Sequence, residues 1–445
     1  MTTSDGARRT LFPYQEDALA YCMKTVHPAL FMEMRLGKTL VTIRSILQKE
    51  ETPTLVVAPV TVLQSWEEEL EKEGQSYRLI RKKKDLQLAN QPGEWTLTNY
   101  EFIRAHPGLA ALEWGSVVFD ESTKIKNPQA QITKLSTRSF KRVLGGRYLL
   151  TGMPAPEGPL NFFSQFQFQT GAFLGFKNYW SFRGALFMPT GYGGHDWQPK
   201  RETRQKVKED VRRRAFCLTR KECKVGSKKI YTSRYVDATP DQRRLAKKAV
   251  EEYALDESDT KWGIVVQTWL AQIAGGFAED KQVSNAKTSE LLSLVKGELA
   301  DQQVVVFYRF NRELNHCLLA LKKAGVSCAS ITGEHSPEQR KLIRRDFQSN
   351  SIRVVLLQVK VARYGLDFSS ASTVVYYSNA YSCEDRAQSE DRVVHPTKEE
   401  PLLYIDLITK GTVDEDVVTV LRDKRMEAQS FTQRLFAAFI RRTAA

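Results

Sequence analysis

The amino-acid sequence predicts an α/β protein with two parallel-sheet domains in tandem and helical insertions between them. At 445 residues the chain is longer than one hydrophobic core usually supports, which favours two domains. Short β-rich apolar runs such as TLVVAPV and SVVFDE alternate with helical patterns in the first half, and QVVVFYRF and IRVVLLQV do so in the second. Strands that alternate with helices in two separate blocks are typical of two parallel sheets.

The two blocks set the expected domain boundaries. We expect an N-terminal domain over residues 1–225 with a helical insertion at about 155–220, a helical connector over 226–285, and a C-terminal domain over 286–445. The aromatic-dense run at 162–187 predicts either stacking platforms for unpaired bases or the core of the insertion, and the core is the commoner use. The glycine-rich stretch at 190–196 predicts a loop. The insertion is also the candidate for a wedge that separates strands.

The charge balance favours a polyanionic partner. The chain has 66 Lys and Arg against 52 Asp and Glu, which gives a net charge of +14. Basic residues gather at 81–84 and over 212–229. The second cluster lies between the two blocks, so it predicts contacts to nucleic-acid phosphates, with a solvated face as the alternative. Because no base-reading module is recognisable, affinity is expected to depend strongly on salt.

The cysteines and the apolar runs exclude other classes. Six cysteines are scattered without CxxC spacing or nearby paired histidines, so neither a zinc site nor a disulfide framework is indicated. Free thiols indicate a reducing compartment. No apolar run approaches the roughly 20 residues that span a bilayer. We therefore expect no membrane association and a cytoplasmic location.

The segment FMEMRLGKTLVTI has the pattern of a phosphate loop. An apolar strand turns at Leu36 and Gly37 and enters a helix, so that backbone N–H groups and the helix N-terminus can meet phosphates. Lys38 would reach the β and γ oxygens of ATP, and the Thr39 hydroxyl would bind Mg²⁺. Met32 stands where the full pattern has its first glycine, so a chance turn is the alternative.

The segment SVVFDESTKIKN supplies an acidic pair. A buried strand that ends in two carboxylates is costly unless they bind a metal or take part in chemistry. Asp120 is expected to hold Mg²⁺, and Glu121 to orient and polarise the attacking water. The alternative is that the strand simply ends in an acidic loop without a function. The presence of the phosphate loop makes this alternative less favourable.

Further motifs follow in an order that resembles the Swi/Snf-type ATPases of helicase superfamily two. The matching segments are LFPYQEDAL, LVVAPVTVLQSWEEEL, TLTNYEFIR, DESTKIKN, LLTGMPAPEGPL, VVVFYRF, ITGEHSPEQRKLIRRDFQ, YGLDFSSASTVVYYS, QSEDRVVHP and GTVDEDV. The resemblance covers nearly the whole chain and implies two RecA-like domains. The length leaves no room for an added nuclease or chromatin-reading domain, so we expect a compact phage or bacterial form.

The resemblance also implies functional residues. The ATP-binding set is Tyr14, Gln15, Gly37, Lys38, Thr39, Gly365, Asp367 and Gln388, with Gln15 reading adenine. The coupling motif includes Thr151 and Gly152. The nucleic-acid set is Thr61, Trp66, Thr98, Asn99, Tyr100 and Arg309. The acidic box ends in threonine where the family commonly has histidine, so coupling to DNA is expected to run differently through Ser122 and Thr123.

QSEDRVVHP falls where the family has its arginine motif. Gln388, Asp391, Arg392 and His395 are spaced as one helix face. The resemblance makes Arg392 catalytic, as the second domain's contribution to hydrolysis. His395 occupies the place of the family's second arginine, so Arg363 and Arg386 are alternatives for the γ-phosphate contact.

Together the motifs predict a DNA-dependent ATPase that moves on duplex, forked or branched DNA in replication, recombination or repair. ATP and Mg²⁺ are the expected cofactors, and a monomer is expected. Two alternatives are an RNA-directed motor of the same superfamily and an ATP-binding nucleic-acid clamp with little turnover.

Overall fold

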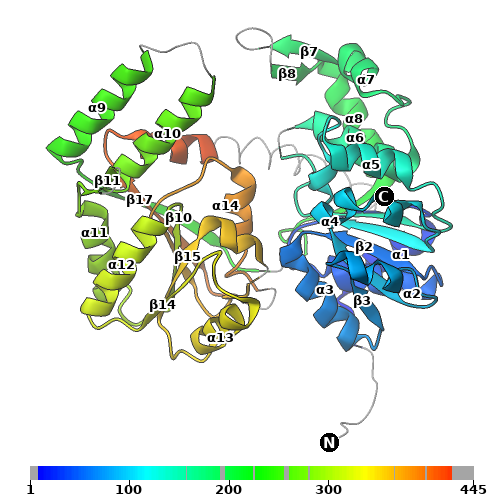
Figure 1. The fold of residues 1–445 in the computed structure, drawn as a ribbon, viewed down its shortest axis with the longest axis horizontal. Helices are drawn as coiled ribbons and strands as arrows, with labels where there is room; N and C mark the ends of the chain where they lie inside the picture. Colours follow the sequence, from blue (N-terminus) through cyan, green and yellow to red (C-terminus); the bar gives the residue numbers. More distant parts are fainter. Residues whose placement is uncertain are drawn as a thin grey trace, which may run out of the picture. The chain divides into compact units, whose positions relative to one another are not determined.

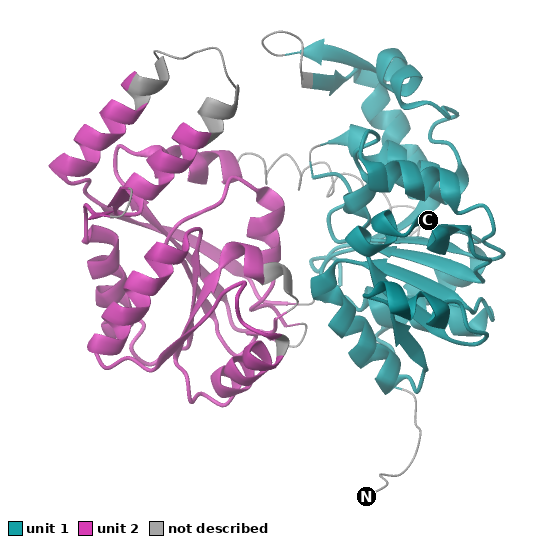
Figure 2. Cartoon of the chain, viewed as in Figure 1, with its two compact units in different colours: residues 1–225, 427–445 teal, residues 226–426 magenta. Residues whose placement is uncertain are grey.

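The computed structural model describes residues 9–156, 158–190, 196–223, 226–254, 260–278, 281–364, 366–395 and 398–422. The chain divides into two compact units (Figure 2). Unit 1 is described within residues 1–225 and unit 2 within residues 226–426. Each is an α/β unit built on one main parallel sheet (Figure 1). The expected fold class is confirmed.

Unit 1 contains a seven-stranded sheet in the order β3-β4-β2-β5-β6-β1-β9, and every neighbouring pair is parallel. Its strands are β1 (Ala29–Met32), β2 (Thr54–Ala58), β3 (Tyr77–Leu79), β4 (Trp95–Asn99), β5 (Ser116–Asp120), β6 (Arg147–Leu150) and β9 (Ala215–Leu218). The central strands β1, β2 and β5 are buried on both faces, which is why they are almost continuously apolar.

Helices cover both faces of this sheet. One core cluster packs α1 (Pro13–Lys24), α2 (Lys38–Gln48) and α3 (Val60–Lys72) against it. A second cluster packs α4 (Tyr100–Ala105), α5 (Gln131–Ser139) and α6 (Phe162–Thr170) against the opposite face. Short 3₁₀ segments are η1 (Lys83–Leu88), η2 (Pro107–Ala111), η3 (Ser122–Ile125) and η4 (Pro159–Asn161). Strands and helices therefore form three layers in unit 1.

The insertion of unit 1 continues from α6 into α7 (Tyr179–Leu186), the antiparallel pair β7 (Phe187–Thr190) and β8 (Asp196–Pro199), and α8 (Arg201–Arg214). Its phenylalanines form the packing that the aromatic run predicts. The buried ones are Phe162, Phe163, Phe166, Phe168, Phe173, Phe182 and Phe187. Most of the glycine-rich stretch expected as a loop lies outside the described residues.

Unit 2 contains a six-stranded parallel sheet in the order β10-β17-β16-β13-β15-β14. Its strands are β10 (Lys229–Val236), β13 (Val304–Tyr308), β14 (Cys328–Ile331), β15 (Val354–Gln358), β16 (Thr373–Tyr376) and β17 (Leu402–Thr409). Its helices are α9 (Pro240–Ala254), α10 (Thr260–Ala274), α11 (Ala286–Lys296), α12 (Asn311–Lys323), α13 (Pro337–Gln348) and α14 (Cys383–Glu390), with the 3₁₀ segment η6 (Val359–Tyr364).

The segment expected as a helical connector, 226–285, does contain α9 and α10. It also contains the edge strand β10, which pairs with β17 over its whole length, and a short antiparallel pair, β11 (Phe277–Ala278) and β12 (Lys281–Gln282). Because β17 lies far from β10 along the chain, no local sequence pattern predicts this pairing. The second sheet therefore begins within the connector.

Candidate active site

The motifs of unit 1 gather at one edge of its sheet. The phosphate loop follows β1, the acidic pair ends β5, and the coupling motif follows β6. These three strands are neighbours and run parallel, so their carboxyl ends meet at the same edge. In open α/β sheets this edge is where ligands bind.

The phosphate loop turns into α2 at Gly37, whose φ of +84° is in the left-handed region. A Cβ at this position would lie 2.1 Å from Nε2 of Gln15, so a side chain there would be both strained and blocked. Lys38 opens α2, and its Nζ donates to the carbonyls of Met32 (2.9 Å) and Glu33 (3.2 Å). The loop thus surrounds the ammonium group with its own backbone.

Gln15 connects helix α1 to this loop. Its buried amide Nε2 donates to the Leu36 carbonyl (3.2 Å), and its Oε1 accepts from the Phe12 N–H (3.1 Å). The neighbouring Tyr14 stacks on the ring of Phe12, with centroids 5.5 Å apart. Of the two residues expected near adenine, Gln15 therefore contacts the backbone of the phosphate loop.

Asp120 is buried at the end of β5. The Trp66 indole N–H donates to its Oδ2 (2.8 Å), and the backbone N–H of Glu121 donates to its Oδ1 (2.8 Å). Burial raises the pKa of this carboxyl, while the indole bond and the charge of Lys38 lower it in part. The influence of Lys38 shows that the two predicted catalytic loops are close enough to interact electrostatically.

Glu121 has an unusual backbone. Its φ of 52° and ψ of 54° are in the left-handed region, which a residue with a side chain rarely adopts. The hydroxyl of the buried Thr151, from the coupling motif, donates to its Oε2 (3.4 Å). The same hydroxyl accepts from the Met153 N–H (3.2 Å). Strain and a hydrogen bond from the next loop thus fix the direction of this carboxylate.

Ser122, the third residue of the acidic box, contacts the insertion. Its hydroxyl donates to Oε1 of Gln165 in α6 (2.7 Å), and both side chains are buried. The Gln165 amide in turn donates to the carbonyls of Pro154 and Asn161, each at 2.8 Å. The acidic box, the coupling loop and α6 are therefore joined by one polar network, which sequence reasoning missed because Gln165 looks like part of an aromatic helix.

Several residues expected at a DNA strand are placed in the interior of unit 1 instead. Trp66 and Thr98 are fully buried, and the Thr98 hydroxyl donates to the Ile80 carbonyl (2.9 Å). The Tyr100 hydroxyl donates to the Asp120 carbonyl (2.7 Å). The side chains of Trp66 and Thr98 are therefore not exposed in this structure, and the Trp66 indole contacts Asp120 instead.

A signal for the burial of Trp66 exists in the sequence. Leu63, Trp66 and Leu70 follow the spacing i, i+3, i+7 of an apolar helix face, and all three are buried in α3. Two other residues of the expected DNA set lie nearer the surface: Thr61 is half-buried, and Asn99 caps α4 by accepting from the Phe102 N–H (2.8 Å).

In unit 2 the arginine motif is built differently from the expected helix face. Helix α14 ends at Glu390, so Arg392 and His395 follow the helix instead of lying on it. The Nε of the half-buried Arg392 donates to the Gln388 carbonyl (3.1 Å), and His395 is exposed. The expected spacing fails because the helix is one turn too short.

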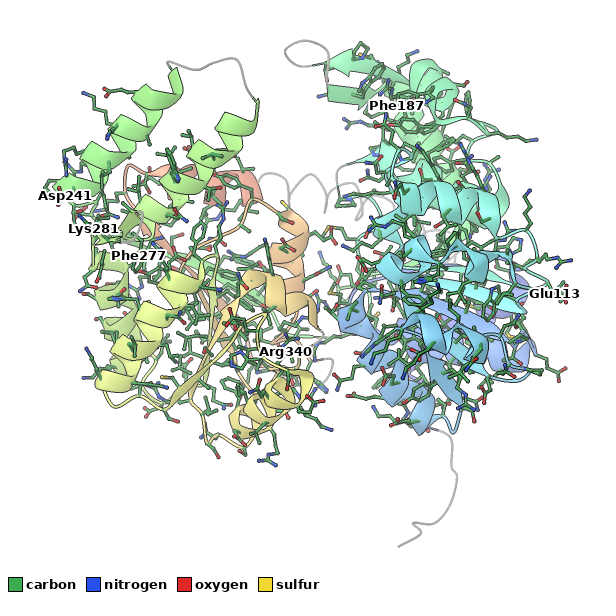
Figure 3. The ribbon with its side chains drawn as sticks, in the orientation of Figure 1. Glu113, Phe187, Asp241, Phe277, Lys281 and Arg340 are labelled. Carbon is green, nitrogen blue, oxygen red and sulfur yellow. The ribbon has the colours of Figure 1, made fainter. Side chains whose placement is uncertain are left out.

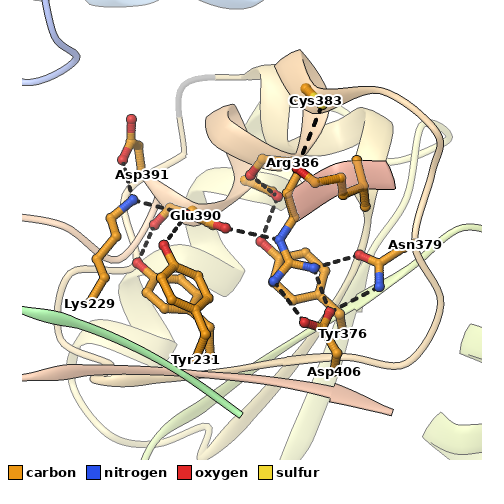
Figure 4. A network of polar contacts seen from close by, with 12 residues as sticks. Lys229, Tyr231, Tyr376, Asn379, Cys383, Arg386, Glu390, Asp391 and Asp406 are labelled. Carbon is orange, nitrogen blue, oxygen red and sulfur yellow. Dashed lines mark hydrogen bonds and ion pairs between the residues drawn. The ribbon is translucent and has the colours of Figure 1, made fainter. Parts of the chain in front are cut away.

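Arg386, one alternative for the γ-phosphate contact, is part of a buried network (Figure 4). Its guanidinium donates to Asp406 (2.6 Å), to Asn379 (2.6 Å) and to Glu390 (3.0 Å), and it lies over the ring of Tyr376 at 3.4 Å. Although burial alone would lower the pKa of Arg386, these carboxylates raise it. The group is engaged in holding β16, β17 and α14 together.

The remaining predicted residues of unit 2 are partly described. Asp367 accepts from the Ser369 N–H (3.0 Å). The Arg309 N–H donates to the Ser378 hydroxyl (2.8 Å), its guanidinium lies over the ring of Tyr381 at 5.3 Å, and burial lowers its pKa. Gly365 and the side chain of Arg363 lie outside the described residues.

Within the described ranges, no cluster of three or more His, Cys, Asp or Glu side chains is placed to hold a metal ion. Mg²⁺ that binds with a nucleotide needs only one or two protein ligands, because phosphates and waters supply the rest. Asp120 and Thr39, the residues expected to bind Mg²⁺, carry oxygen donors of the kind that such a site uses. None of the helices in the described ranges combines the length and apolar character needed to cross a membrane.

Comparison with known proteins identifies the class. A model described as the SNF2-related domain matches residues 14–230, and one described as the helicase conserved C-terminal domain matches residues 286–396. A phosphate loop and acidic pair in the first match, followed by the second match, define a helicase of superfamily two. Within that superfamily the chain belongs to the Swi/Snf type, as the order of its motifs predicts.

The chain is similar to proteins from distant organisms. It is 24% identical over 418 residues to an uncharacterized ATP-dependent helicase of Mycoplasma pneumoniae, covering 88% of this chain and 39% of that protein. It is 21% identical to a putative ATP-dependent helicase/translocase of Bacillus subtilis, covering 95% and 49%. The chain therefore spans half or less of the length of these relatives. A Sulfolobus solfataricus SWI2/SNF2 ATPase core in complex with dsDNA aligns with a TM-score of 0.47 at 22% identity, covering 96% and 95%.

Proposed function

We propose that the chain is an ATP-dependent DNA translocase, in which unit 1 binds and hydrolyses ATP and the chain moves on duplex, forked or branched DNA. The observation that carries this proposal is the convergence of Lys38 and Asp120 at one sheet edge. They come from different loops, and the charge of Lys38 acts on the buried carboxyl of Asp120. A lysine at the start of a helix and a buried carboxylate at the same sheet edge suit a magnesium–nucleotide complex.

The phosphate loop would bind the nucleotide through charge and backbone dipoles. Lys38 would exchange its two carbonyl partners for the β and γ oxygens, and the N-terminus of α2 would donate backbone N–H groups. Thr39 and Asp120 would hold Mg²⁺, which neutralises phosphate charge when bound. Gln15 would read the adenine while its hydrogen bond to Leu36 keeps the loop in register.

Glu121 would orient the attacking water and draw a proton from it. The reaction needs the water in line with the bond to the leaving oxygen, so the direction of this carboxylate matters more than its basicity. Its left-handed backbone and the Thr151 hydroxyl supply that direction. A shift in the coupling loop would therefore change the direction of the Glu121 carboxylate.

Arg392 is our candidate for the contribution of unit 2. A guanidinium stabilises the charge that develops on the phosphoryl oxygens in the transition state. Arg386 is less suitable, because a contact to phosphate would break its ion pairs with the buried Asp406 and Glu390. Gln388, whose carbonyl accepts from Arg392, would help to place the arginine.

DNA is the partner that the charge and the family favour. The net charge of +14 suits a phosphate backbone. Replication, recombination or repair would use such a motor. We propose a cytoplasmic monomer.

The test is a panel of ATP hydrolysis and strand-separation assays with the full chain. The DNA forms are blunt duplex, fork, four-way junction and single strand, with single-stranded and duplex RNA beside them. We expect duplex-containing DNA to stimulate hydrolysis and RNA to do so weakly. Equal stimulation by RNA would favour the RNA-directed motor. ATP binding with no stimulated hydrolysis in any arm would favour the clamp.

A further inference from the structure

The aromatic run of the insertion divides into two parts that differ in exposure. Its phenylalanines are buried in the core of unit 1, whereas Trp180 in α7 is 52% exposed. Phe187, labelled in Figure 3, packs on Phe182 with ring centroids 5.3 Å apart. Core packing therefore explains the phenylalanines and leaves the tryptophan unexplained.

Trp180 belongs to a stack of three side chains. The guanidinium of Arg183 lies 4.6 Å from the centroid of the Trp180 ring and 4.1 Å from that of Trp197 in β8. Trp197 is partly buried and packs on the core of unit 1. The stack thus runs from the core at Trp197, through the cation, to the exposed indole.

Local structure holds this stack in place. The Asn178 side chain caps α7 by accepting from the N–H groups of Trp180 (2.8 Å) and Ser181 (3.2 Å). In the antiparallel pair, Trp197 lies opposite Pro189, which shares a strand face with the buried Phe187. β7 and β8 lie beside α7 (Figure 1). Helix α7 and the β7–β8 pair therefore hold the exposed indole of Trp180 in place.

The surroundings are strongly basic. Residues 177 to 206 contain six Lys or Arg and two Asp or Glu. Four of these cations are exposed and lie within a few residues of the stack or of β8: Lys177, Lys200, Arg201 and Arg204. Nζ of Lys200 donates to the Ala185 carbonyl at the end of α7 (2.7 Å), which brings its charge next to that helix. A polyanion is the complementary partner.

We infer that Trp180, Arg183 and Trp197 form a stacking platform for unpaired nucleotides of a DNA fork, with Trp180 as the contact to a base. An exposed indole backed by a guanidinium offers a flat π surface, and nearby cations can meet phosphates. Bases inside a duplex have both faces stacked on their neighbours, so only an unpaired base can use this surface. The inference rests on the proposed function only in taking DNA as the partner.

The test measures equilibrium binding of the full chain to fluorescein-labelled DNA, without ATP. Three probes share one duplex: a blunt end, a fork with unpaired thymidine arms, and the same fork with abasic arms. For the unchanged chain we expect the thymidine fork to bind more tightly than the abasic fork. Trp180→Ala should reduce affinity for the thymidine fork roughly 5- to 150-fold, since one stacked base contributes about 1–3 kcal/mol.

Trp180→Ala should leave affinity for the blunt duplex and the abasic fork unchanged, because those probes offer only phosphates and stacked bases. Trp180→Phe should keep most of the preference. Leu144→Ala is the matched control, since Leu144 is an exposed apolar residue of unit 1, outside the insertion and 74% exposed. If Trp180→Ala lowers the thermal unfolding temperature, Arg183→Lys replaces it, because lysine keeps the charge and loses the flat guanidinium.

Two outcomes would overturn the inference: an unchanged chain that binds thymidine and abasic forks equally, or a Trp180→Ala loss of the same size on all three probes. Failure of the proposed function looks different. It would appear as absence of DNA-stimulated hydrolysis in the unchanged chain, while the preference for unpaired bases measured without ATP would remain.

Discussion

Units 1 and 2 share a parallel-sheet architecture but bury charge in different ways. In unit 1, Asp120 is buried with two hydrogen-bond donors, an indole and a backbone N–H, and its pKa is raised. In unit 2, Arg386 is buried among Asp406, Asn379 and Glu390, in direct ion pairs and hydrogen bonds. In unit 1 a cation would therefore stabilise the carboxylate of Asp120. In unit 2 the charge of Arg386 is already balanced by the carboxylates around it.

The difference separates residues that act on a substrate from residues that hold the fold. A buried charge with direct partners of opposite charge stabilises one arrangement of the chain, and removal of one partner is costly. A buried carboxylate held mostly by neutral donors favours an added cation. The partners of a buried charged residue therefore indicate its role better than its residue type does.

The largest effect should come from the catalytic loops of unit 1. Lys38→Ala removes the cation that would meet the phosphates, and Glu121→Gln removes the carboxylate that would orient water. Each should lower DNA-stimulated ATP hydrolysis roughly 100-fold or more. A steady-state hydrolysis assay measures this, and blunt-duplex binding should stay the same. Normal turnover by either variant would contradict the assignment of the site.

The two arginines of unit 2 should separate activity from stability. Arg392→Ala should lower hydrolysis roughly 100-fold with a smaller change in unfolding than Arg386→Ala, because Arg392 is only half-buried. Arg386→Ala should lower the free energy of unfolding by about 3–5 kcal/mol, because it removes the ion pair of the buried Asp406, while Glu390 keeps its ion pair with Lys229. Hydrolysis rates and urea unfolding measure the pair. If Arg392→Ala hydrolyses ATP normally, Arg363 becomes the next candidate.

A smaller effect is expected from Trp66→Phe, which keeps an aromatic ring in the core and removes the donor to Asp120. The Mg²⁺ concentration needed for half-maximal hydrolysis should rise about 10-fold, as is typical when a residue that orients a metal ligand is lost. Trp95→Phe is a matched control. Trp95 is equally buried and lies beside Trp66, but its indole nitrogen has no hydrogen-bond partner among the described residues. A similar shift in both variants would indicate general packing damage.

The last prediction concerns the pH dependence of the stability of unit 2. Burial raises the pKa of Glu313 from 4.5 to about 7, although the Ser378 hydroxyl bond and the charge of Lys287 lower it and that of Asp414 raises it again. The folded chain therefore binds this proton more tightly than the unfolded chain. The resulting stability is complete below about pH 4.5 and is lost as pH rises through about 7.

The prediction is that the free energy of unfolding falls by the order of 2 kcal/mol between pH 5 and pH 8, and that Glu313→Gln flattens this dependence. Urea unfolding at several pH values measures it. Glu334→Gln, at an exposed position of the same unit, should keep the original slope. Equal slopes for the unchanged chain and Glu313→Gln would show that other groups dominate.

Local patterns were sufficient for much of the fold and for the loops of the candidate site. Alternating strands and helices predicted both sheets, and strand-to-turn transitions predicted the positions of Lys38 and Asp120. Contacts between distant segments were not predictable in this way. The Trp66 bond to Asp120 spans 54 residues, and the Ser122 bond to Gln165 spans 43. The length of α14 also escaped prediction, because a polar helix pattern does not say where its last turn ends.

The pairing of β10 with β17 has a consequence for the order of synthesis. Val236 ends β10 and Leu402 begins β17, so 165 residues lie between the two strands. At about 5–20 residues per second, a ribosome makes β17 roughly 10 to 30 seconds after β10. During that interval β10 has no partner along this edge, and unpaired strand edges promote association between chains. Strand β10 is thus synthesised first in the second sheet and pairs with β17 only after that strand has been made.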